Sequence, residues 1–197
     1  MSELNKLFDD PIEIYINKLC NYITDFILDN KLPITPNMIS IARILLSFLL
    51  LFFTKNYKVI AVIYLICRIF DNWDGILARK GNMQSKLGDK LDHYGDFLET
   101  FILIILLLIN SKNKNIYYFV IPIILNLYNG INIGCQQIYL NKNAKNNNDK
   151  KDLIDFGKHS CPKCLYNNKW IFKIIGYGVT ITLITLFLLN IPKFNKN

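Results

Sequence analysis

The chain reads Asp71-Asn-Trp-Asp74-Gly75-Ile-Leu-Ala78-Arg79, continues for eight residues, and resumes as Gly88-Asp-Lys-Leu-Asp92-His-Tyr-Gly-Asp96. Long apolar runs lie on both sides of this acidic segment, residues 71–96. Carboxylates in or beside hydrocarbon are costly, because their charge loses its solvation there. A chain that groups them at such a place is therefore expected to use them chemically.

The composition indicates a membrane protein built from helices. Hydrophobic residues make up 52% of the 197 residues, more than a soluble domain of this length needs. They gather in five runs, at residues 38–53, 59–70, 97–109, 116–140 and 170–189. A helix needs about 20 residues to cross roughly 30 Å of hydrocarbon, where only a helix satisfies its own backbone. We predict an all-α, polytopic membrane bundle of five transmembrane helices, the first three completed by their polar flanks. The alternative is a soluble helical protein with very apolar helices.

The charged loops orient this bundle. The formal net charge is +8 and comes mainly from lysines in the loops. Basic residues concentrate in the polar stretch 141–169 and around the acidic segment, at Arg79, Lys80, Lys86 and Lys90. By the positive-inside rule both regions face the cytoplasm, which the two spans between them permit. The site and the N-terminus are then cytoplasmic and the C-terminus lies across the membrane. The basic balance favours anionic lipid headgroups over nucleic acid as partners.

The N-terminal part is expected to form a separate interfacial segment. Residues 11–30 carry apolar side chains at helical spacing, at Ile12, Tyr15, Ile16, Leu19, Ile23 and Phe26. This pattern predicts an amphipathic helix in the membrane interface that docks on the spans. Pro33 and Pro36 end it, and Thr35 or Asn37 is the N-cap of the first span. The first strong apolar run begins too late for a secretory signal peptide.

The expected organisation has three parts: a cytoplasmic interfacial segment at 1–37, a membrane domain at 38–190 and a tail at 191–197. The membrane domain includes the polar cytoplasmic loop 141–169. In that loop only His159-Ser-Cys161-Pro-Lys-Cys164 has metal-like spacing. A structural zinc site needs four ligands, and the chain's other histidine lies in the acidic segment. We therefore expect reduced thiols here.

The first half of the acidic segment forms one helix face. If the second apolar helix continues through residue 79, that face carries two carboxylates and two small residues: Asp71, Asp74, Gly75 and Ala78. The small residues leave room for a bulky or phosphorylated ligand against the backbone. Arg79 follows at the helix end, where its guanidinium can hold a phosphate.

The second half forms a matching face. The next helix is expected to begin near Gly88, and its aspartates then lie at i, i+3 and i+7: Asp89, Asp92 and Asp96. Because the connecting loop is short, we predict that the two helices are antiparallel neighbours. Their aspartate faces then meet at the cytoplasmic side of the membrane.

Carboxylates that converge in this way repel one another unless cations lie between them. Oxygen ligands beside a phosphate favour Mg²⁺ or Mn²⁺ over zinc. Such a site can polarise a phosphoryl oxygen and neutralise a leaving group, and an aspartate at its edge can take a proton from a hydroxyl. The alternative is that the acidic segment is only a solvated, charged link between two helices, but this would not explain the small residues Gly75 and Ala78 on the same face.

These residues resemble a known family. The pattern Asp-x-x-Asp-Gly-x-x-Ala-Arg, eight residues, Gly-x-x-x-Asp-x-x-x-Asp is similar to the signature of the CDP-alcohol phosphatidyltransferases, and all eight specified positions are filled. The resemblance implies an integral membrane enzyme of phospholipid synthesis. Such an enzyme moves a phosphatidyl or phosphoalcohol group from a CDP-linked donor to a hydroxyl acceptor and releases CMP.

The resemblance also implies roles by position. It assigns two Mg²⁺ or Mn²⁺ ions to Asp71, Asp74, Asp92 and Asp96, and the proton-accepting role to Asp96. It assigns the cytidine diphosphate to Gly75, Ala78, Arg79 and Gly88. Asp89 lies outside the signature.

Other polar residues are candidates for the same pocket. Pro36-Asn37-Met-Ile-Ser40-Ile-Ala-Arg43 resembles the start of the family's first span. Arg43 is expected to face the bundle and to pair with a substrate phosphate or with the aspartates. Arg68, one turn before Asp71, is equally interpreted as a structural partner of an acidic residue. Asn129, Asn132 and Gln136 form a stripe suited to a hydroxyl-rich acceptor or to hydrogen bonds between helices.

Several questions stay open on the sequence alone. Family members typically have at least six spans and five are counted here, so either the fourth run hides a break or the C-terminal half is reduced. Chain length favours enzymes that use CDP-diacylglycerol with a small polar alcohol. The Asp92-His93 pair and the region from Asp10-Pro11 to Pro36-Asn37 look more like enzymes that use CDP-ethanolamine or CDP-choline. A carboxylate-lined cation transporter and a membrane prenyltransferase with a metal-bound pyrophosphate are the other functions considered. Whether the protein is a homodimer, and in which membrane, is left open.

Overall fold

The computed structural model describes residues 10–110, 117–143 and 176–194. The helices in these ranges are α1 (Pro11–Asp29), α2 (Pro36–Leu49), the 3₁₀ helix η2 (Leu50–Phe53), α3 (Tyr57–Lys80), α4 (Lys86–Asn110), α5 (Tyr117–Asn143) and α8 (Tyr177–Phe194). The described ranges contain no strand, which confirms the all-α prediction. The His159, Cys161 and Cys164 group lies outside them, as does most of the predicted 141–169 loop.

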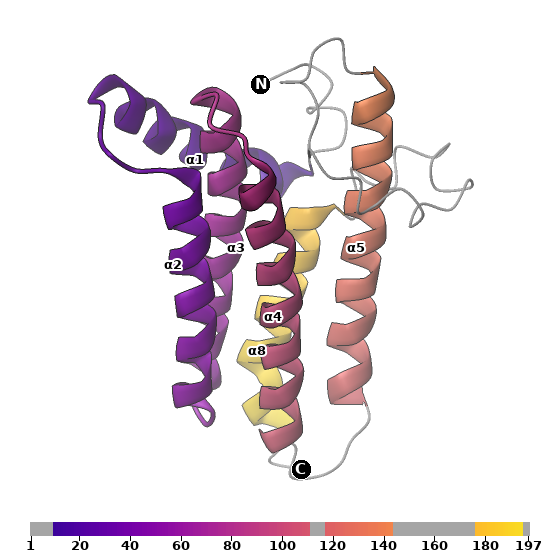
Figure 1. The fold of residues 1–197 in the computed structure, drawn as a ribbon. Coiled ribbons are helices and arrows are strands. Elements are labelled where there is room, and N and C mark those ends of the chain that lie inside the picture. Colours follow the sequence, from indigo (N-terminus) through magenta and orange to yellow (C-terminus); the bar gives the residue numbers. More distant parts are fainter. Residues whose placement is uncertain (1–9, 111–116, 144–175, 195–197) are drawn as a thin grey trace.

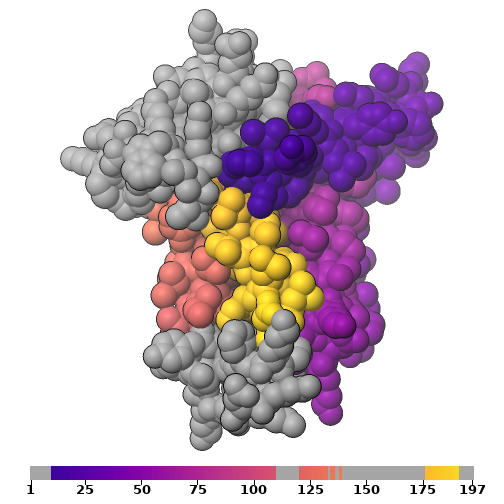
Figure 2. Space-filling view, turned by 180° about the vertical axis from the view of Figure 1, so that it is seen from behind, coloured from indigo at the N-terminus to yellow at the C-terminus, as the bar shows by residue number. Residues whose placement is uncertain are grey.

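Helices α2, α3, α4, α5 and α8 run side by side, and α1 lies across one end of them (Figure 1). Helix α2 packs against α3 and α4, and α8 packs against α3, α5 and α1. The view from behind shows α8 beneath α1, between α5 and α3 (Figure 2). Buried aliphatic side chains of α3, α4 and α8 form the main core, among them Ile60, Leu103 and Ile184.

The helix ends follow from local capping. The Thr35 hydroxyl accepts a hydrogen bond from the Met38 amide at 3.4 Å, so Thr35 is the N-cap of α2, one of the two residues predicted. Helix α3 ends at Lys80 with Gly81 as its C-cap, and Asn82 follows with a φ of 53°. Ser85 Oγ then accepts from the Gly88 amide at 3.0 Å, which caps α4 two residues before the predicted start. The short turn between α3 and α4 keeps the two halves of the acidic segment at the same end of the bundle.

Helix α1 docks on the bundle by a different face from the one predicted. Three of the six apolar side chains expected to pack inward remain exposed, at 72% for Tyr15, 51% for Leu19 and 56% for Phe26, and the other three are only half-buried. The buried face is instead mostly polar or small, made of Glu13, Asn17, Cys20, Thr24 and Ile27. Hydrogen bonds such as that from the Trp73 indole to Thr24 Oγ1, at 3.1 Å, make this polar contact possible. The apolar face of α1 is therefore free to contact another apolar medium.

One stretch in the described residues, 36–53, is long and apolar enough to cross a membrane. It comprises α2 and η2. Two further apolar stretches, 120–132 and 177–190, are shorter. The count of five spans therefore stays a prediction.

Candidate active site

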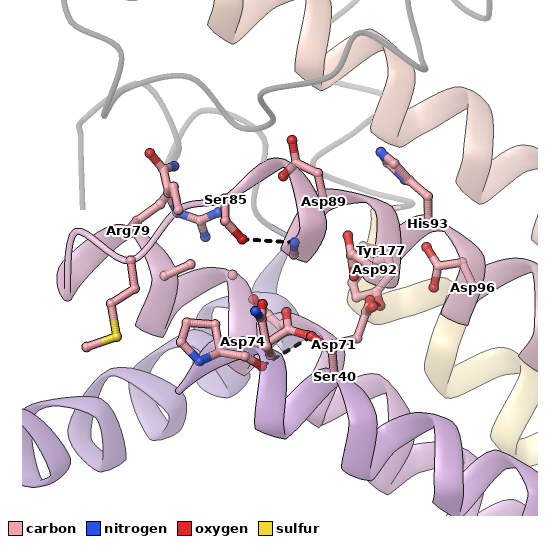
Figure 3. Close-up of a pocket in the computed structure, with 18 of the residues that line it drawn as sticks. Ser40, Asp71, Asp74, Arg79, Ser85, Asp89, Asp92, His93, Asp96 and Tyr177 are labelled. Atoms are coloured by element: carbon pink, nitrogen blue, oxygen red, sulfur yellow. Dashed lines mark hydrogen bonds between the residues drawn. The ribbon is translucent and has the colours of Figure 1, made fainter. Parts of the chain in front are cut away.

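A cavity of about 140 Å³ opens beside the turn between α3 and α4 (Figure 3). Residues from α1, α2, α3, α4, α8 and the α3–α4 turn line it. All eight positions of the signature are among them: Asp71, Asp74, Gly75, Ala78, Arg79, Gly88, Asp92 and Asp96. Asp89, His93 and Ser40 also line it. The predicted convergence of the two aspartate faces on one pocket is therefore confirmed.

The α3 face forms one wall. Asp74 is 5% exposed, and Ser40 Oγ donates a hydrogen bond to its Oδ2 at 2.6 Å. Ser40 comes from the first turns of α2, so the packing of α2 on α3 fixes this carboxylate. The interaction belongs to the stretch 36–43 that the sequence singled out, but the sequence did not predict its partner.

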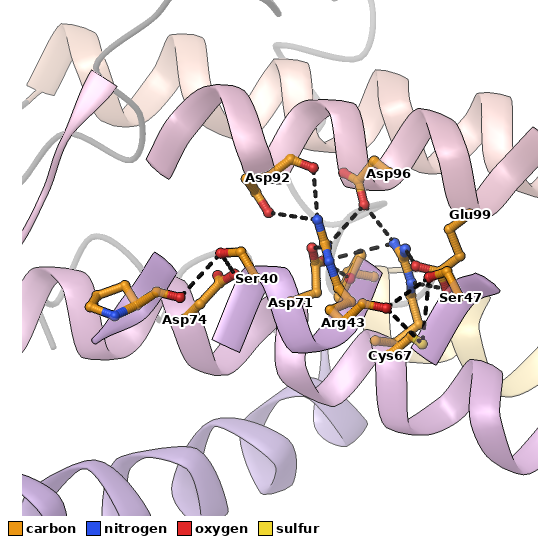
Figure 4. A network of polar contacts seen from close by, with 12 residues as sticks. Ser40, Arg43, Ser47, Cys67, Asp71, Asp74, Asp92, Asp96 and Glu99 are labelled. Atoms are coloured by element: carbon orange, nitrogen blue, oxygen red, sulfur yellow. Dashed lines mark hydrogen bonds and ion pairs between the residues drawn. The ribbon is translucent and has the colours of Figure 1, made fainter. Parts of the chain in front are cut away.

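The α4 face forms the opposite wall, and α3 and α4 contact one another, as predicted for antiparallel neighbours, through side chains such as Arg68 with Asp96 and Glu99. Helix α2 packs tightly along both, whereas α3 and α4 meet through side chains. Two buried arginines lie between the polar faces of these helices: Arg43 from α2 contacts Asp71 and Asp96 (Figure 4). Arg68 from α3 contacts Asp96 as well. The aspartate faces thus approach one another across guanidinium groups.

Arg43 is fully buried among the aspartates. Its guanidinium forms an ion pair with Asp71, lies 3.3 Å from Asp96 Oδ1, and donates a hydrogen bond to the Asp92 carbonyl oxygen at 2.8 Å. Asp92 Oδ1 lies 3.4 Å from it. Gly95 faces this guanidinium, and a Cβ there would overlap Arg43 Nη2. Arg43 was predicted to pair with a substrate phosphate or with the aspartates, and in the structure it contacts the aspartates.

Arg68 is held by a second set of carboxylates. Its Nε lies 3.0 Å from Glu99 Oε1 and its Nη2 contacts the other Glu99 oxygen, while its Nη1 lies 3.0 Å from Asp96 Oδ1. Glu99 is 1% exposed. The prediction that Arg68 partners an acidic residue is confirmed. Glu99 was not singled out, although a carboxylate i+3 from Asp96 at the start of an apolar run was a usable signal.

Two of the small signature residues permit close approaches between parts of the chain. A Cβ on Gly75 would lie 3.2 Å from Arg79 Nη1, so the arginine folds back over the glycine one turn before it. A Cβ on Gly88 would lie 3.1 Å from Asn37 Oδ1 and 3.2 Å from Ser85 Oγ. Gly88 therefore lets the start of α4 lie against the start of α2, and Gly75 lets a guanidinium reach the pocket floor.

Tyr177 is a pocket residue that the sequence did not reveal. It lies at the start of α8 and its hydroxyl donates a hydrogen bond to Asp71 Oδ2. It lies inside the apolar run 170–189, and 106 positions separate it from Asp71, so no local pattern connects the two. Near it, Thr180 Oγ1 lies 3.1 Å from Asn129 Oδ1, which supports hydrogen bonding between helices for that part of the α5 stripe. The Gln136 side chain lies outside the described residues.

The donor set fits a hard divalent cation in its chemistry. The four signature aspartates and Asp89, from two helices, line one cavity, and Asp92 Oδ1 is buried and accepts no hydrogen bond within the described residues. In the part of the chain that is described, however, no three acidic, histidine or cysteine side chains form a ready-made metal site. Arg43 contacts three of the aspartates and so takes the place of a positive charge.

Comparison with known proteins agrees with this site. Residues 33–151, more than half of the chain, match the CDP-alcohol phosphatidyltransferase family, and the chain belongs to this family. It is 35% identical over 81 residues to a CDP-diacylglycerol–glycerol-3-phosphate 3-phosphatidyltransferase of Aquifex aeolicus (strain VF5). That match covers 40% of this chain and 46% of the relative, so the chain spans about half the length of the relative. No solved structure matches.

Proposed function

We propose that the protein is an integral membrane phosphotransferase of phospholipid synthesis. It transfers a phosphatidyl group from CDP-diacylglycerol to a small polar alcohol and releases CMP. The observation that carries this proposal is that all eight signature positions surround one cavity, including four carboxylates from α3 and α4. The name of the Aquifex relative supports CDP-diacylglycerol as the donor.

The outer surface supports a position inside the bilayer. Large apolar side chains point away from the bundle on α2, α3, α4, α5 and α8, with exposed fractions of 64% for Leu45, 55% for Val62, 61% for Phe101, 64% for Leu127 and 50% for Leu186. An apolar surface of this extent is unfavourable in water and favourable in lipid. We propose that the helices span the membrane several times, that α1 lies in the interface on its apolar face, and that the pocket faces the cytoplasm.

Each group of pocket residues has a distinct proposed role in this reaction. Divalent ions held by Asp71, Asp74, Asp92 and Asp96 would neutralise phosphate charge during the transfer. Arg79 lies over Gly75 at the end of α3, where its guanidinium can hold the diphosphate of the donor. Ser40 fixes Asp74 by its hydrogen bond of 2.6 Å. The guanidiniums of Arg43 and Arg68, 3.3 and 3.0 Å from Asp96 Oδ1, fix that carboxylate beside the cavity.

In the proposed transfer step Asp96 acts as the base. The oxygen of the acceptor hydroxyl forms a bond to the phosphatidyl phosphorus, and the bond from that phosphorus to the CMP oxygen breaks. CMP leaves with the electron pair of that bond. The proton of the hydroxyl passes to the Asp96 carboxylate, which is the role of a general base.

Neither other function accounts for the same residues. A cation transporter would use the carboxylates but gives no purpose to Gly75, Arg79 and Gly88 at the same cavity. A prenyltransferase would use the carboxylates with a pyrophosphate, but the chain belongs to the CDP-alcohol family. Both are therefore less favoured than phosphatidyl transfer.

A donor and acceptor matrix tests the proposal. The purified protein in detergent with Mg²⁺ is mixed with CDP-diacylglycerol or with CDP-choline or CDP-ethanolamine, each with a polar alcohol or with diacylglycerol, and CMP is measured. We expect CMP only with CDP-diacylglycerol and a polar alcohol such as glycerol 3-phosphate. CMP only from CDP-choline or CDP-ethanolamine would correct the donor, and no CMP from any pair would reject the enzyme assignment.

A further inference from the structure

One residue of the pocket comes from far along the chain. Among the described residues, those that line the pocket lie between positions 13 and 96 with the exception of Tyr177. Tyr177 also lies outside residues 33–151, the part that matches the family. Its hydroxyl nevertheless reaches Asp71, one of the four carboxylates of the site (Figure 3). Helix α8 therefore contributes a polar group to a site whose other described residues come from the N-terminal half of the chain.

We infer that Tyr177 is a positioning residue that orients the Asp71 carboxylate for a divalent cation. The inference rests on the proposed metal-dependent function. Asp71 is held on both oxygens: Arg43 contacts Oδ1, the Tyr177 hydroxyl donates to Oδ2, and Arg68 Nη1 lies 3.8 Å from Oδ2. Carboxylates that bind metals are themselves commonly fixed by hydrogen bonds from neighbouring groups. A phenol fixes the carboxylate without adding a further positive charge that would repel the cation.

The start of α8 is fixed firmly enough to make this contact directional. The Val179 amide donates to Asp10 Oδ2 at 3.0 Å, while Asp10 Oδ1 accepts from the amides of Ile12 and Glu13 at 2.8 and 2.9 Å. A single buried carboxylate thus ties the first turn of α8 to the first turn of α1. A Cβ on Gly178 would lie 2.6 Å from the Glu13 amide nitrogen, so the two helices touch at backbone distance.

A purely structural role must be distinguished from this one, because buried tyrosines normally find a hydrogen-bond acceptor. Tyr64 provides a matched control. It is 3% exposed where Tyr177 is 7% exposed, its ring lies against Arg68, and it does not line the pocket. Tyr64→Phe removes one buried hydroxyl from the same core and keeps the ring against Arg68.

The test measures metal binding directly. Mn²⁺ is titrated into the purified wild-type protein, Tyr177→Phe and Tyr64→Phe, and free Mn²⁺ is followed by its electron paramagnetic resonance signal. We expect Tyr177→Phe to bind Mn²⁺ about 10-fold more weakly, the lower end of what loss of such a supporting group costs. Tyr64→Phe should bind as the wild type does. Equal affinity in Tyr177→Phe and wild type would overturn the inference and leave the proposed function standing, whereas a wild type that binds no Mn²⁺ would reject the metal chemistry of the function itself.

A second measurement covers a variant that is unstable in detergent. In membranes that contain Tyr177→Phe, the Mg²⁺ concentration for half-maximal CMP release should rise about 10-fold. A merely lower amount of folded protein would reduce the maximal rate at an unchanged Mg²⁺ requirement. An unchanged requirement would overturn the inference.

Discussion

The contact between Gly95 and Arg43 gives a prediction whose size follows from the structure. Gly95 lies on α4 against the Arg43 guanidinium, and an added Cβ would overlap Nη2 and lie 3.0 Å from Cζ. An exposed arginine would simply move away. Arg43 is fully buried and held by three aspartates, so Gly95→Ala must break contacts that hold the centre of the site together.

Two effects of opposite sign set the magnitude. Displacing Nη2 loses its hydrogen bond of 2.8 Å to the Asp92 carbonyl. Loss of a hydrogen bond from a charged group costs about 1.5–3 kcal/mol in the free energy of unfolding. Alanine in place of glycine inside a helix returns up to about 1 kcal/mol. We therefore expect Gly95→Ala to be less stable than the wild type by about 1 kcal/mol.

Gly130→Ala is the matched control. Gly130 lies inside α5, and a Cβ there would meet no atom of the described residues within 4 Å. In this variant only the higher helix propensity of alanine acts, so its free energy of unfolding should rise by about 1 kcal/mol. The two variants then differ by about 2 kcal/mol, which corresponds to a difference of roughly 4–8 °C in melting temperature for a chain of this size.

Thermal unfolding of both variants in the same detergent measures this difference. Gly95→Ala should melt below the wild type and Gly130→Ala at or above it, and Gly95→Ala should also release CMP more slowly because Asp92 and Asp96 lose their common partner. Identical melting of the two variants would refute the placement of Arg43 among the aspartates.

Three further outcomes test other parts of the structure. Glu99→Gln should lower the free energy of unfolding by about 3 kcal/mol, because the buried Arg68 guanidinium loses its doubly bonded carboxylate; unchanged melting would contradict this pair. Asp10→Asn should cost about 1 kcal/mol, because an amide cannot accept from the starts of both α1 and α8; a melting temperature equal to that of the wild type would show that the shared cap is unimportant. Burial raises the pKa of the Cys20 thiol to about 11, so the reactive thiolate is scarce at pH 8. Maleimide labelling of Cys20, detected on its peptide by mass spectrometry, should therefore need denaturant. Rapid labelling of the native protein would argue against the burial of this face of α1.

The local geometry of the site could be predicted because it depends on short spacings. Asp71 and Asp74 share a face since both lie on one helix, and the short turn before Gly88 returns the chain to the same end of the bundle. The capping residue Thr35 was likewise among the candidates, because caps depend on a few neighbouring residues.

Contacts between distant helices could not be predicted in this way. Tyr177 is separated from Asp71 by 106 residues, and an apolar run gives no reason to select its first tyrosine as a pocket residue. The predicted docking face of α1 was correct only in part, because hydrophobic periodicity identifies an apolar face but not the medium that it contacts. In water that face would pack inward, whereas here Tyr15 and Phe26 stay exposed.

Release of CMP from CDP-diacylglycerol with glycerol 3-phosphate, measured with and without Mg²⁺, tests the central claim most directly. Asp96→Asn removes the proposed base, and Asp25→Asn makes the same change at an exposed residue whose carboxylate pairs with Lys80 at 2.7 Å. We predict Mg²⁺-dependent release by the wild type and by Asp25→Asn, and a rate at least ~100-fold lower for Asp96→Asn. Equal rates for the two variants, or release that needs no Mg²⁺, would contradict the account.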